Sequence, residues 1–173
     1  MALDPPLDAS PEAVRAALAP LRNDFAVALH SCQNPFAVGA IIRVAHSFLA
    51  REIIVIGEEP YYPKASMGME KYETIVTVKD DAAFFDHVQG RPVWAIEKDD
   101  ARTSLYDVAT FPRNVVLLFG SERFGLPRAM IEAANEVVGI PMYGVNHSFP
   151  VTVAAGIVMN EWARRRYVSW AVA

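Results

Sequence analysis

The chain has 173 residues, of which 53% are hydrophobic and 21% charged, and its formal net charge is −4. This length fits one domain with a substantial core, and the composition excludes an intrinsically disordered protein. The acidic balance argues against a protein that coats nucleic acid through bulk charge, although it leaves room for a local basic patch.

Targeting and redox signals are absent from the sequence. No apolar run approaches the ~18 residues that span a bilayer, and the acidic, proline-interrupted start resembles neither a signal peptide nor a transit peptide. The single cysteine, Cys32, excludes an intramolecular disulfide, and the four histidines show no metal-ligand spacing with it. We therefore expect a reduced cytoplasmic protein without a structural metal.

Secondary-structure signals run along the whole chain. Residues 10–21 predict a short helix with Ser10 as its cap and Pro11 in its first turn. A strand at residues 25–32 precedes a helix at residues 36–50, whose apolar residues recur with helical period on one face. Continuous apolar strands are predicted at 52–57, 73–78, 92–97, 115–120 and 136–141, with helices from about Asp80 to Gln89 and from about Val151 to Tyr167.

The strands indicate the fold class. Short strands of continuous Val, Ile and Leu are typical of a parallel sheet that helices cover on both faces, and strand–helix alternation points the same way. We predict an α/β fold with a mostly parallel sheet. Ligands of such sheets bind beyond the carboxyl ends of the strands, which directs attention to the loops after Ile96, Phe119 and Ile140.

The loop in LLFGSERFGLP (117–127) places two glycines around a serine and a glutamate at a strand end. Gly120 lets a ligand approach the backbone, and Ser121 and Glu122 offer polar groups. The stretch is neither a phosphate-binding P-loop nor a GxGxxG fingerprint. A tight turn with a solvated glutamate explains it about as well.

The loop in IPMYGVNHSFP (140–150) leads into the last predicted helix. Ser148 is a candidate cap, and Pro150 suits a first helical turn. A cap does not account for Asn146 and His147. The small residues that follow, at 154–156, allow close packing within the core or across a subunit interface.

Arg43 lies in the predicted helix of NPFAVGAIIR (34–43) and points away from its apolar face. The ordinary interpretation is an exposed helical arginine. The functional one is a guanidinium that holds an RNA phosphate or stabilises a developing alkoxide.

These three stretches, taken in order, resemble the motifs of the SpoU (TrmH-like) branch of the SPOUT RNA methyltransferases. The resemblance runs from about Phe25 to the end of the last helix, and three ordered motifs are far more specific than any one. It implies a Rossmann-like, mostly parallel α/β sheet whose C-terminal part is tied into a trefoil knot. That domain would cover residues 23–173, after a helical extension of residues 1–22.

The activity of this family supplies further expectations. Its members bind S-adenosylmethionine, act as homodimers and typically methylate a ribose 2′-hydroxyl of tRNA or rRNA, without a metal and away from membranes. Carried over by position, the implied cofactor-binding residues are Ile96, Gly120, Ile140, Met142, Ser148 and Phe149. The implied catalytic residues are Arg43 and Glu122, and the implied substrate-binding residues are Asn34, Arg43, Arg123 and Asn146.

The chemistry of methyl transfer fits an arginine. The methyl group of a sulfonium is already electrophilic, so the enzyme must hold the hydroxyl in line and assist the loss of its proton. A guanidinium stays charged at neutral pH and is a poor base. Arg43 is therefore expected to stabilise the alkoxide, with a phosphate of the RNA relaying the proton.

Two positions depart from the family pattern and keep a second function open. Ala37 and Pro150 stand where the motifs usually have asparagine. The alternative is a catalytically inactive SPOUT-fold protein that binds RNA or assists assembly. An α/β protein that binds another nucleotide is a weaker third possibility, since both glycine-rich phosphate fingerprints are missing.

Local patches must supply any RNA affinity. The candidate cations are Arg43, Lys64, Lys71, Arg123, Arg128 and the cluster Arg164 to Arg166, although cations at a helix C-terminus are favoured by the helix dipole in any case. Tyr61, Tyr62 and Tyr72 are candidates for stacking on unpaired bases. Packing within their loop is the commoner role of such tyrosines.

Overall fold

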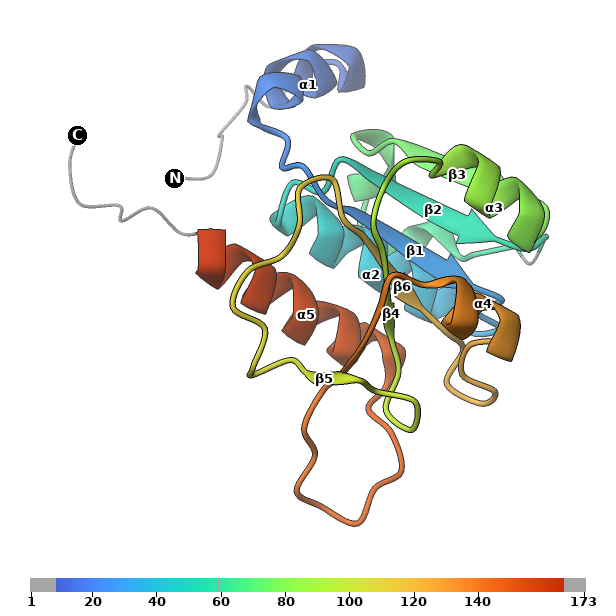
Figure 1. Ribbon diagram of the computed structural model, residues 1–173. Coiled ribbons are helices and arrows are strands. Elements are labelled where there is room, and N and C mark those ends of the chain that lie inside the picture. Colours follow the sequence, from blue (N-terminus) through green and yellow to red (C-terminus); the bar gives the residue numbers. More distant parts are fainter. Residues whose placement is uncertain (1–8, 59, 167–173) are drawn as a thin grey trace.

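The computed structural model describes residues 9–58 and 60–166, in which strands and helices alternate (Figure 1). The strands are β1 (Ala26–His30), β2 (Glu52–Ile56), β3 (Ile75–Val78), β4 (Val93–Ile96), β5 (Thr103–Ser104), β6 (Val116–Phe119) and β7 (Glu136–Gly139). The α-helices are α1 (Pro11–Leu18), α2 (Pro35–Ser47), α3 (Asp81–His87), α4 (Arg128–Ala133) and α5 (Val151–Arg166). Short 3₁₀ helices occur at η1 (Ala19–Leu21), η2 (Pro63–Ser66) and η3 (Met69–Lys71).

The strands of the described residues form one sheet in the order β3-β2-β1-β6-β4-β7-β5. Every pairing between neighbouring strands is parallel. The predicted parallel α/β fold is thereby confirmed. Because all strands run the same way, their carboxyl ends meet at one edge of the sheet. The C-terminal knot stays a prediction.

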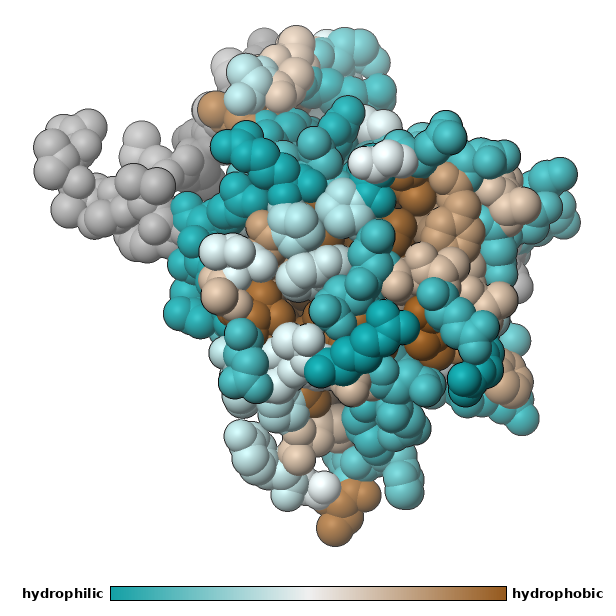
Figure 2. Space-filling model, viewed as in Figure 1, coloured by the Kyte–Doolittle hydropathy of each residue, from teal (hydrophilic) through white to brown (hydrophobic). Residues whose placement is uncertain are grey.

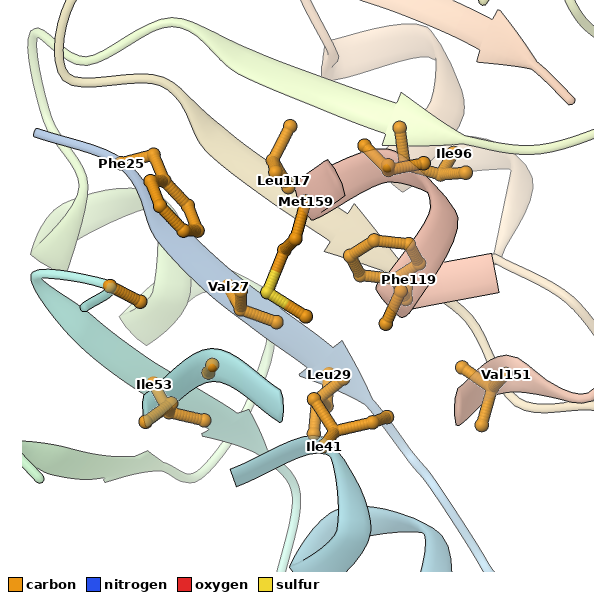
Figure 3. Packing of buried hydrophobic residues seen from close by; sticks show 14 of the residues in the cluster. Phe25, Val27, Leu29, Ile41, Ile53, Ile96, Leu117, Phe119, Val151 and Met159 are labelled. Carbon is orange, nitrogen blue, oxygen red and sulfur yellow. The ribbon is translucent and has the colours of Figure 1, made fainter. Parts of the chain in front are cut away.

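Two apolar clusters lie on opposite faces of the sheet. Val27 belongs to the cluster that contains residues of α2 and α5, whereas its neighbour Ala28 belongs to the one with residues of α3 and α4. Figure 3 shows Met159 of α5 and Ile41 of α2 pointing toward β1 from the first of these layers. The sheet is therefore the middle of three layers, buried on both sides, which explains why its strands are continuously apolar.

Polar side chains cap the first two α-helices. The Ser10 side chain accepts a hydrogen bond from the Ala13 N–H at 3.2 Å, and Pro11 opens α1 as predicted. Asn34 caps α2 by accepting from the Phe36 N–H at 3.1 Å, with Pro35 as the first helical residue. Asparagine followed by proline thus specifies where α2 begins.

The start of α5 differs from the prediction for Ser148. The helix begins at Val151, and the Pro150 carbonyl accepts hydrogen bonds from the N–H groups of Val153 and Ala154 at 2.9 and 3.0 Å. Pro150 therefore stands directly before the helix, and Ser148 lies two positions earlier, in the loop. The predicted end of this helix at Tyr167 lies outside the described residues.

Arginines attach the N-terminal segment to the sheet domain. The Arg22 guanidinium donates to the carbonyls of Ala50 and Tyr72 at 2.8 and 2.6 Å and forms an ion pair with the buried Glu73. Arg15 donates to the Lys71 carbonyl at 2.6 Å. The division at residue 22 stays a prediction.

No helix in the described part of the chain is long and apolar enough to cross a membrane.

Candidate functional site

A cavity of about 410 Å³ lies at the carboxyl edge of the sheet, where β6, β4 and β7 are neighbours. The loops that follow these three strands converge there, as the topology rule for open parallel sheets predicts. All the residues assigned to a cofactor from the sequence line it, namely Ile96, Gly120, Ile140, Met142, Ser148 and Phe149. Glu122 and Arg123 line it as well.

Gly120 and Gly125 bring the ends of the second loop into contact. The Gly125 N–H donates to the Ser121 carbonyl at 2.9 Å, and the Ser121 hydroxyl accepts from the Phe124 N–H at 3.2 Å. A Cβ atom at Gly120 would lie 2.3 Å from the carbonyl carbon of Gly125, and Gly125 itself has φ +65°. This loop therefore requires glycine at both positions.

Glu97 joins the first loop to the second. Its carboxylate accepts from the backbone N–H groups of Lys98 and Leu126, at 2.9 and 3.3 Å. A Cβ atom at Gly125 would lie 2.7 Å from the same carboxylate. None of the three sequence motifs includes Glu97, and its only signal in the sequence is an acidic residue directly after a buried strand.

Lys98 joins the first loop to the third. Its ammonium group donates to the His147 carbonyl at 3.0 Å. The third loop, residues 141–149, protrudes from the body at the bottom of Figures 1 and 2, and its Tyr143 and Val145 are 89% and 96% exposed. The contact from Lys98 therefore fixes the inner end of an otherwise exposed segment.

The cavity has an apolar floor and a polar rim. Ile96, Phe119 and Ile140, at the ends of the three strands, are buried, whereas Glu122 and Ser148 are exposed. The lining combines these apolar side chains with charged and polar groups from all three loops, and convergent polar groups around an apolar floor are typical of sites for small organic ligands. In the part of the chain that the structure describes, no cluster of His, Cys, Asp or Glu could hold a metal ion.

The remaining predicted site residues lie elsewhere. Arg43 is exposed on α2, as its helical position predicted, and like Asn34 it does not line the cavity. Asn146 lines a second cavity of about 410 Å³, on the β5 side of the third loop, together with Lys98 and Arg102. The structure thus brings together the cofactor residues with Glu122 and Arg123, but not the other assigned residues.

The basic cluster at the end of α5 has structural partners. Arg165 donates to the carbonyls of Val108 and Leu105 at 2.5 and 2.9 Å, and Arg166 donates to the Phe111 carbonyl at 3.2 Å. These contacts hold the segment between β5 and β6 against the helix. Of the three, Arg164 is the exposed one, and it pairs with Glu161. The cluster therefore stabilises the fold, and two of its members are not free for RNA.

The fold and the cavity define an α/β protein with a ligand-sized cavity beyond the carboxyl ends of a parallel sheet. Comparison with known proteins shows which family within that class the chain belongs to. Residues 24–160 match the model of the SpoU rRNA Methylase family, and the chain belongs to this family.

Curated relatives agree with the family. The chain is 32% identical over 146 residues to the 23S rRNA (guanosine-2′-O-)-methyltransferase RlmB of Ralstonia nicotianae, which covers 81% of this chain and 58% of the relative. It is 26% identical over 147 residues to the putative TrmH family tRNA/rRNA methyltransferase YacO of Bacillus subtilis, covering 82% and 59%. The chain thus spans less than two thirds of the length of these relatives.

Solved structures share the architecture. The SpoU methyltransferase AviRb of Streptomyces viridochromogenes, in complex with AdoMet, superimposes with a TM-score of 0.75 at 28% identity, over 87% of this chain and 61% of AviRb. The TrmH/SpoU tRNA modifying enzyme of A. aeolicus superimposes with a TM-score of 0.77 at 22% identity, over 90% and 82%. The second comparison supports the fold alone.

Proposed function

We propose that this protein is an S-adenosylmethionine-dependent RNA methyltransferase that modifies a ribose 2′-hydroxyl of tRNA or rRNA. The observation that carries the proposal is the cavity formed by the three loops, which all six residues assigned to the cofactor line. AviRb, a structural relative, is solved with AdoMet bound. The RlmB relatives are named as guanosine-2′-O-methyltransferases of 23S rRNA.

The residues of the cavity fit this cofactor. A volume of about 410 Å³ lies within the ~300–1,000 Å³ of typical ligand sites. The side chains of Ile96, Ile140 and Phe149 would hold the apolar parts of the cofactor, and backbone groups of the loop that Gly120 opens would hold its polar parts. When bound, S-adenosylmethionine supplies an electrophilic methyl group.

The other residues would then handle the ribose. The Arg43 guanidinium would hold the substrate and stabilise the alkoxide as the 2′-hydroxyl loses its proton to a phosphate of the RNA. Glu122 and Arg123, on the exposed rim of the cavity, would orient the substrate at its mouth. Asn34 and Asn146 would contact the RNA on either side.

We also propose that two copies of the chain work together. Arg43 does not line the cavity of its own chain, so a second copy that supplies it would complete the site. Val153 of α5 is 45% exposed, and the adjoining Gly156 and Ile157 are half-buried. This partly exposed apolar stripe of α5 would suit contact with another protein surface.

Calorimetric titration with S-adenosylmethionine, and with S-adenosylhomocysteine for comparison, tests the cofactor proposal. We expect saturable binding at about one site per chain. Labelled methyl transfer to total RNA, followed by digestion to 2′-O-methylated nucleosides, then tests the reaction. A folded protein that binds neither compound, with or without RNA, would refute the proposal.

The departure at position 37 is the observation that favours the alternative. Ala37 is 4% exposed and belongs to the apolar core, so no amide is available where the family motif has one. A non-catalytic RNA-binding protein would bind RNA and transfer no methyl group to any of it. One methylated nucleotide that depends on the purified protein would exclude this function.

A further inference from the structure

Two aromatic side chains lie side by side on the surface near Arg43. Phe36, in the first turn of α2, is 59% exposed, and Tyr62, directly before η2, is 39% exposed. Their ring centroids are 4.8 Å apart, with an angle of 48° between the planes. Neither ring is buried in the core. Large aromatic rings are usually buried, and those that stay exposed together often mark a binding site.

The backbone holds this pair in place. The Tyr62 N–H donates to the Pro35 carbonyl at 3.0 Å. Gly39 allows the loop to rest directly on α2, because a Cβ atom there would lie 2.7 Å from the Tyr62 carbonyl oxygen and 2.6 Å from the Ala65 Cβ. The two rings are therefore presented by a fixed contact between α2 and η2, and a ligand would not have to order them first.

The pair shares a face of α2 with Arg43. Arg43 follows Phe36 by seven positions in the helix. This spacing corresponds to a rotation about 20° short of two full turns and to a rise of about 10 Å along the axis. That distance corresponds to about three steps of ~3.4 Å between stacked nucleotides. A strand of RNA lying along this face would reach both the aromatic pair and the guanidinium.

The charges of this surface suit a nucleic acid. Arg43 and Lys64 are exposed, and neither has an ion-pair partner within the described residues. The carboxylate of Glu70, in η3, is hydrogen-bonded to the Ser66 hydroxyl. Two free cations beside two exposed rings match the alternation of phosphates and bases in single-stranded RNA.

We propose that Phe36 and Tyr62 form a stacking platform for an unpaired RNA base that lies within a few nucleotides of the one whose ribose faces Arg43. This inference rests on the proposed function, because it names the part of the RNA that the same site would recognise. Stacking on a flat ring tolerates any base. The platform would therefore contribute affinity and position the strand, while the identity of the target nucleotide is selected elsewhere.

The test uses two fluorescent probes of about 12 units, a length within the range of single-stranded binding sites. One is oligouridine, and the other is an abasic ribose-phosphate chain with the same number of phosphates. We expect the unmodified protein to bind oligouridine at least tenfold more tightly than the abasic probe. The double variant Phe36→Ala/Tyr62→Ala should lose this preference while its affinity for the abasic probe stays unchanged.

Single variants separate stacking from apolar contact. Phe36→Trp keeps a flat ring and should retain the preference, whereas Phe36→Leu keeps apolar surface without a stacking face and should lower it as Phe36→Ala does. Tyr106→Ala, which removes an exposed aromatic side chain (56%) between β5 and β6, is the matched control and should change nothing. Circular dichroism would verify that each variant is folded.

Three results would overturn the platform. The double variant could weaken both probes equally, it could bind both as the unmodified protein does, or it could shift sedimentation toward smaller species with the preference for bases intact. In the last case the rings contact a second copy of the chain. Calorimetry with S-adenosylmethionine on the same samples reports on the proposed function separately, since neither probe experiment requires the cofactor.

Discussion

At the residue scale, the cavity depends on positions where a side chain has no room. Gly120 is such a position, because its Cβ would lie 2.3–2.6 Å from the backbone of Gly125 and Leu126. Backbone atoms cannot turn away as the end of a flexible side chain can. We expect Gly120→Ala to displace the second loop, to lower the free energy of unfolding by about 1–3 kcal/mol and to weaken S-adenosylmethionine binding more than tenfold.

Gly144→Ala is the matched control for this prediction. Nothing lies within 4 Å of a Cβ at Gly144, and this residue is not among those lining the cavity at the strand ends. Urea unfolding and calorimetry should leave it indistinguishable from the unmodified protein. Equal effects from the two substitutions would show that the close approach at Gly120 does not shape the site.

The role proposed for Arg43 is different, and its loss should have a different signature. Arg43→Ala is expected to reduce methyl transfer by about 10²–10³-fold, the cost of removing one donor to a developing oxyanion. Cofactor affinity should stay nearly unchanged, since Arg43 does not line the cavity. Arg113→Ala, which removes an exposed arginine near the amino end of β6, is the control. An active Arg43→Ala protein would remove Arg43 from the mechanism.

At the element scale, buried carboxylates join segments that are distant in the sequence. The Glu73 side chain is 0% exposed and pairs with Arg22 of the N-terminal segment and with His46 of α2, whose Nδ1 is 2.6 Å away. Removing the Glu73 carboxylate would leave the charge of the Arg22 guanidinium without its buried partner. We expect Glu73→Ala to lower the free energy of unfolding by about 3–5 kcal/mol, as measured by urea denaturation.

An exposed ion pair provides the comparison. Arg128 and Glu132 of α4 are 81% and 62% exposed, and pairs of this kind contribute about 0–1 kcal/mol. Glu132→Ala should therefore cost little. If both substitutions cost the same, the contact between the N-terminal segment and the sheet domain would not be a structural anchor.

Glu52 gives the fold a dependence on acid pH. Burial raises the pKa of its carboxyl, but hydrogen bonds from His87, 2.9 Å away, and from Arg91 outweigh burial and hold the pKa below its ordinary value of 4.5. A carboxyl whose pKa is lower in the folded state stabilises the fold above its unfolded pKa, and this contribution is lost as the pH falls through the folded one.

Glu52→Gln should therefore be less stable than the unmodified protein at neutral pH, with a difference that shrinks as the pH falls below about 4.5. Urea unfolding across this range measures the difference directly. If the difference in the free energy of unfolding between the two proteins stays constant, or widens in acid, the charge of Glu52 does not stabilise the fold.

How far the sequence predicts the elements depends on the physical origin of each. The inner strands and α2 are specified locally, by continuous apolar runs, by helical period and by the Asn34-Pro35 start, and they lie within a few residues of their predicted bounds. The two-residue strand β5 and the six-residue α4 have too few residues to show a period. They exist because of packing against β7 and against the sheet.

The candidate site shows the same division. The residues of the cavity follow from the strand ends and the three motifs, so all six assigned positions meet there. The roles of Glu97 and Arg165 consist of hydrogen bonds to backbone groups of residues 126, 105 and 108. No pattern within a single stretch encodes such long-range partners, and for that reason the sequence alone presented Arg165 as a candidate for RNA.

At the scale of the whole molecule, the separation of Arg43 from the cavity leads to a complementation experiment. If a second copy supplies Arg43, then a dimer of one Arg43→Ala chain and one Gly120→Ala chain contains one complete site, made from the intact cavity of the first and the intact arginine of the second. If each chain uses its own arginine, this mixed dimer contains no complete site. The two arrangements therefore predict opposite results for the same mixture.

We expect that the two variants, each nearly inactive alone when S-adenosylmethionine is limiting, regain about a quarter of the unmodified activity when their subunits exchange at random in a twofold dimer. Half of the dimers would then be mixed, and each of these would have one working site. Co-expression with two affinity tags would isolate the mixed dimer, and labelled methyl transfer would report its activity. Sedimentation of the unmodified protein should show a dimer, and Val153→Asp, which places a charge on the apolar stripe of α5, should both dissociate it and abolish the regained activity. No regained activity from an isolated mixed dimer would place Arg43 with the cavity of its own chain, and would require the third loop or the RNA to close the distance between them.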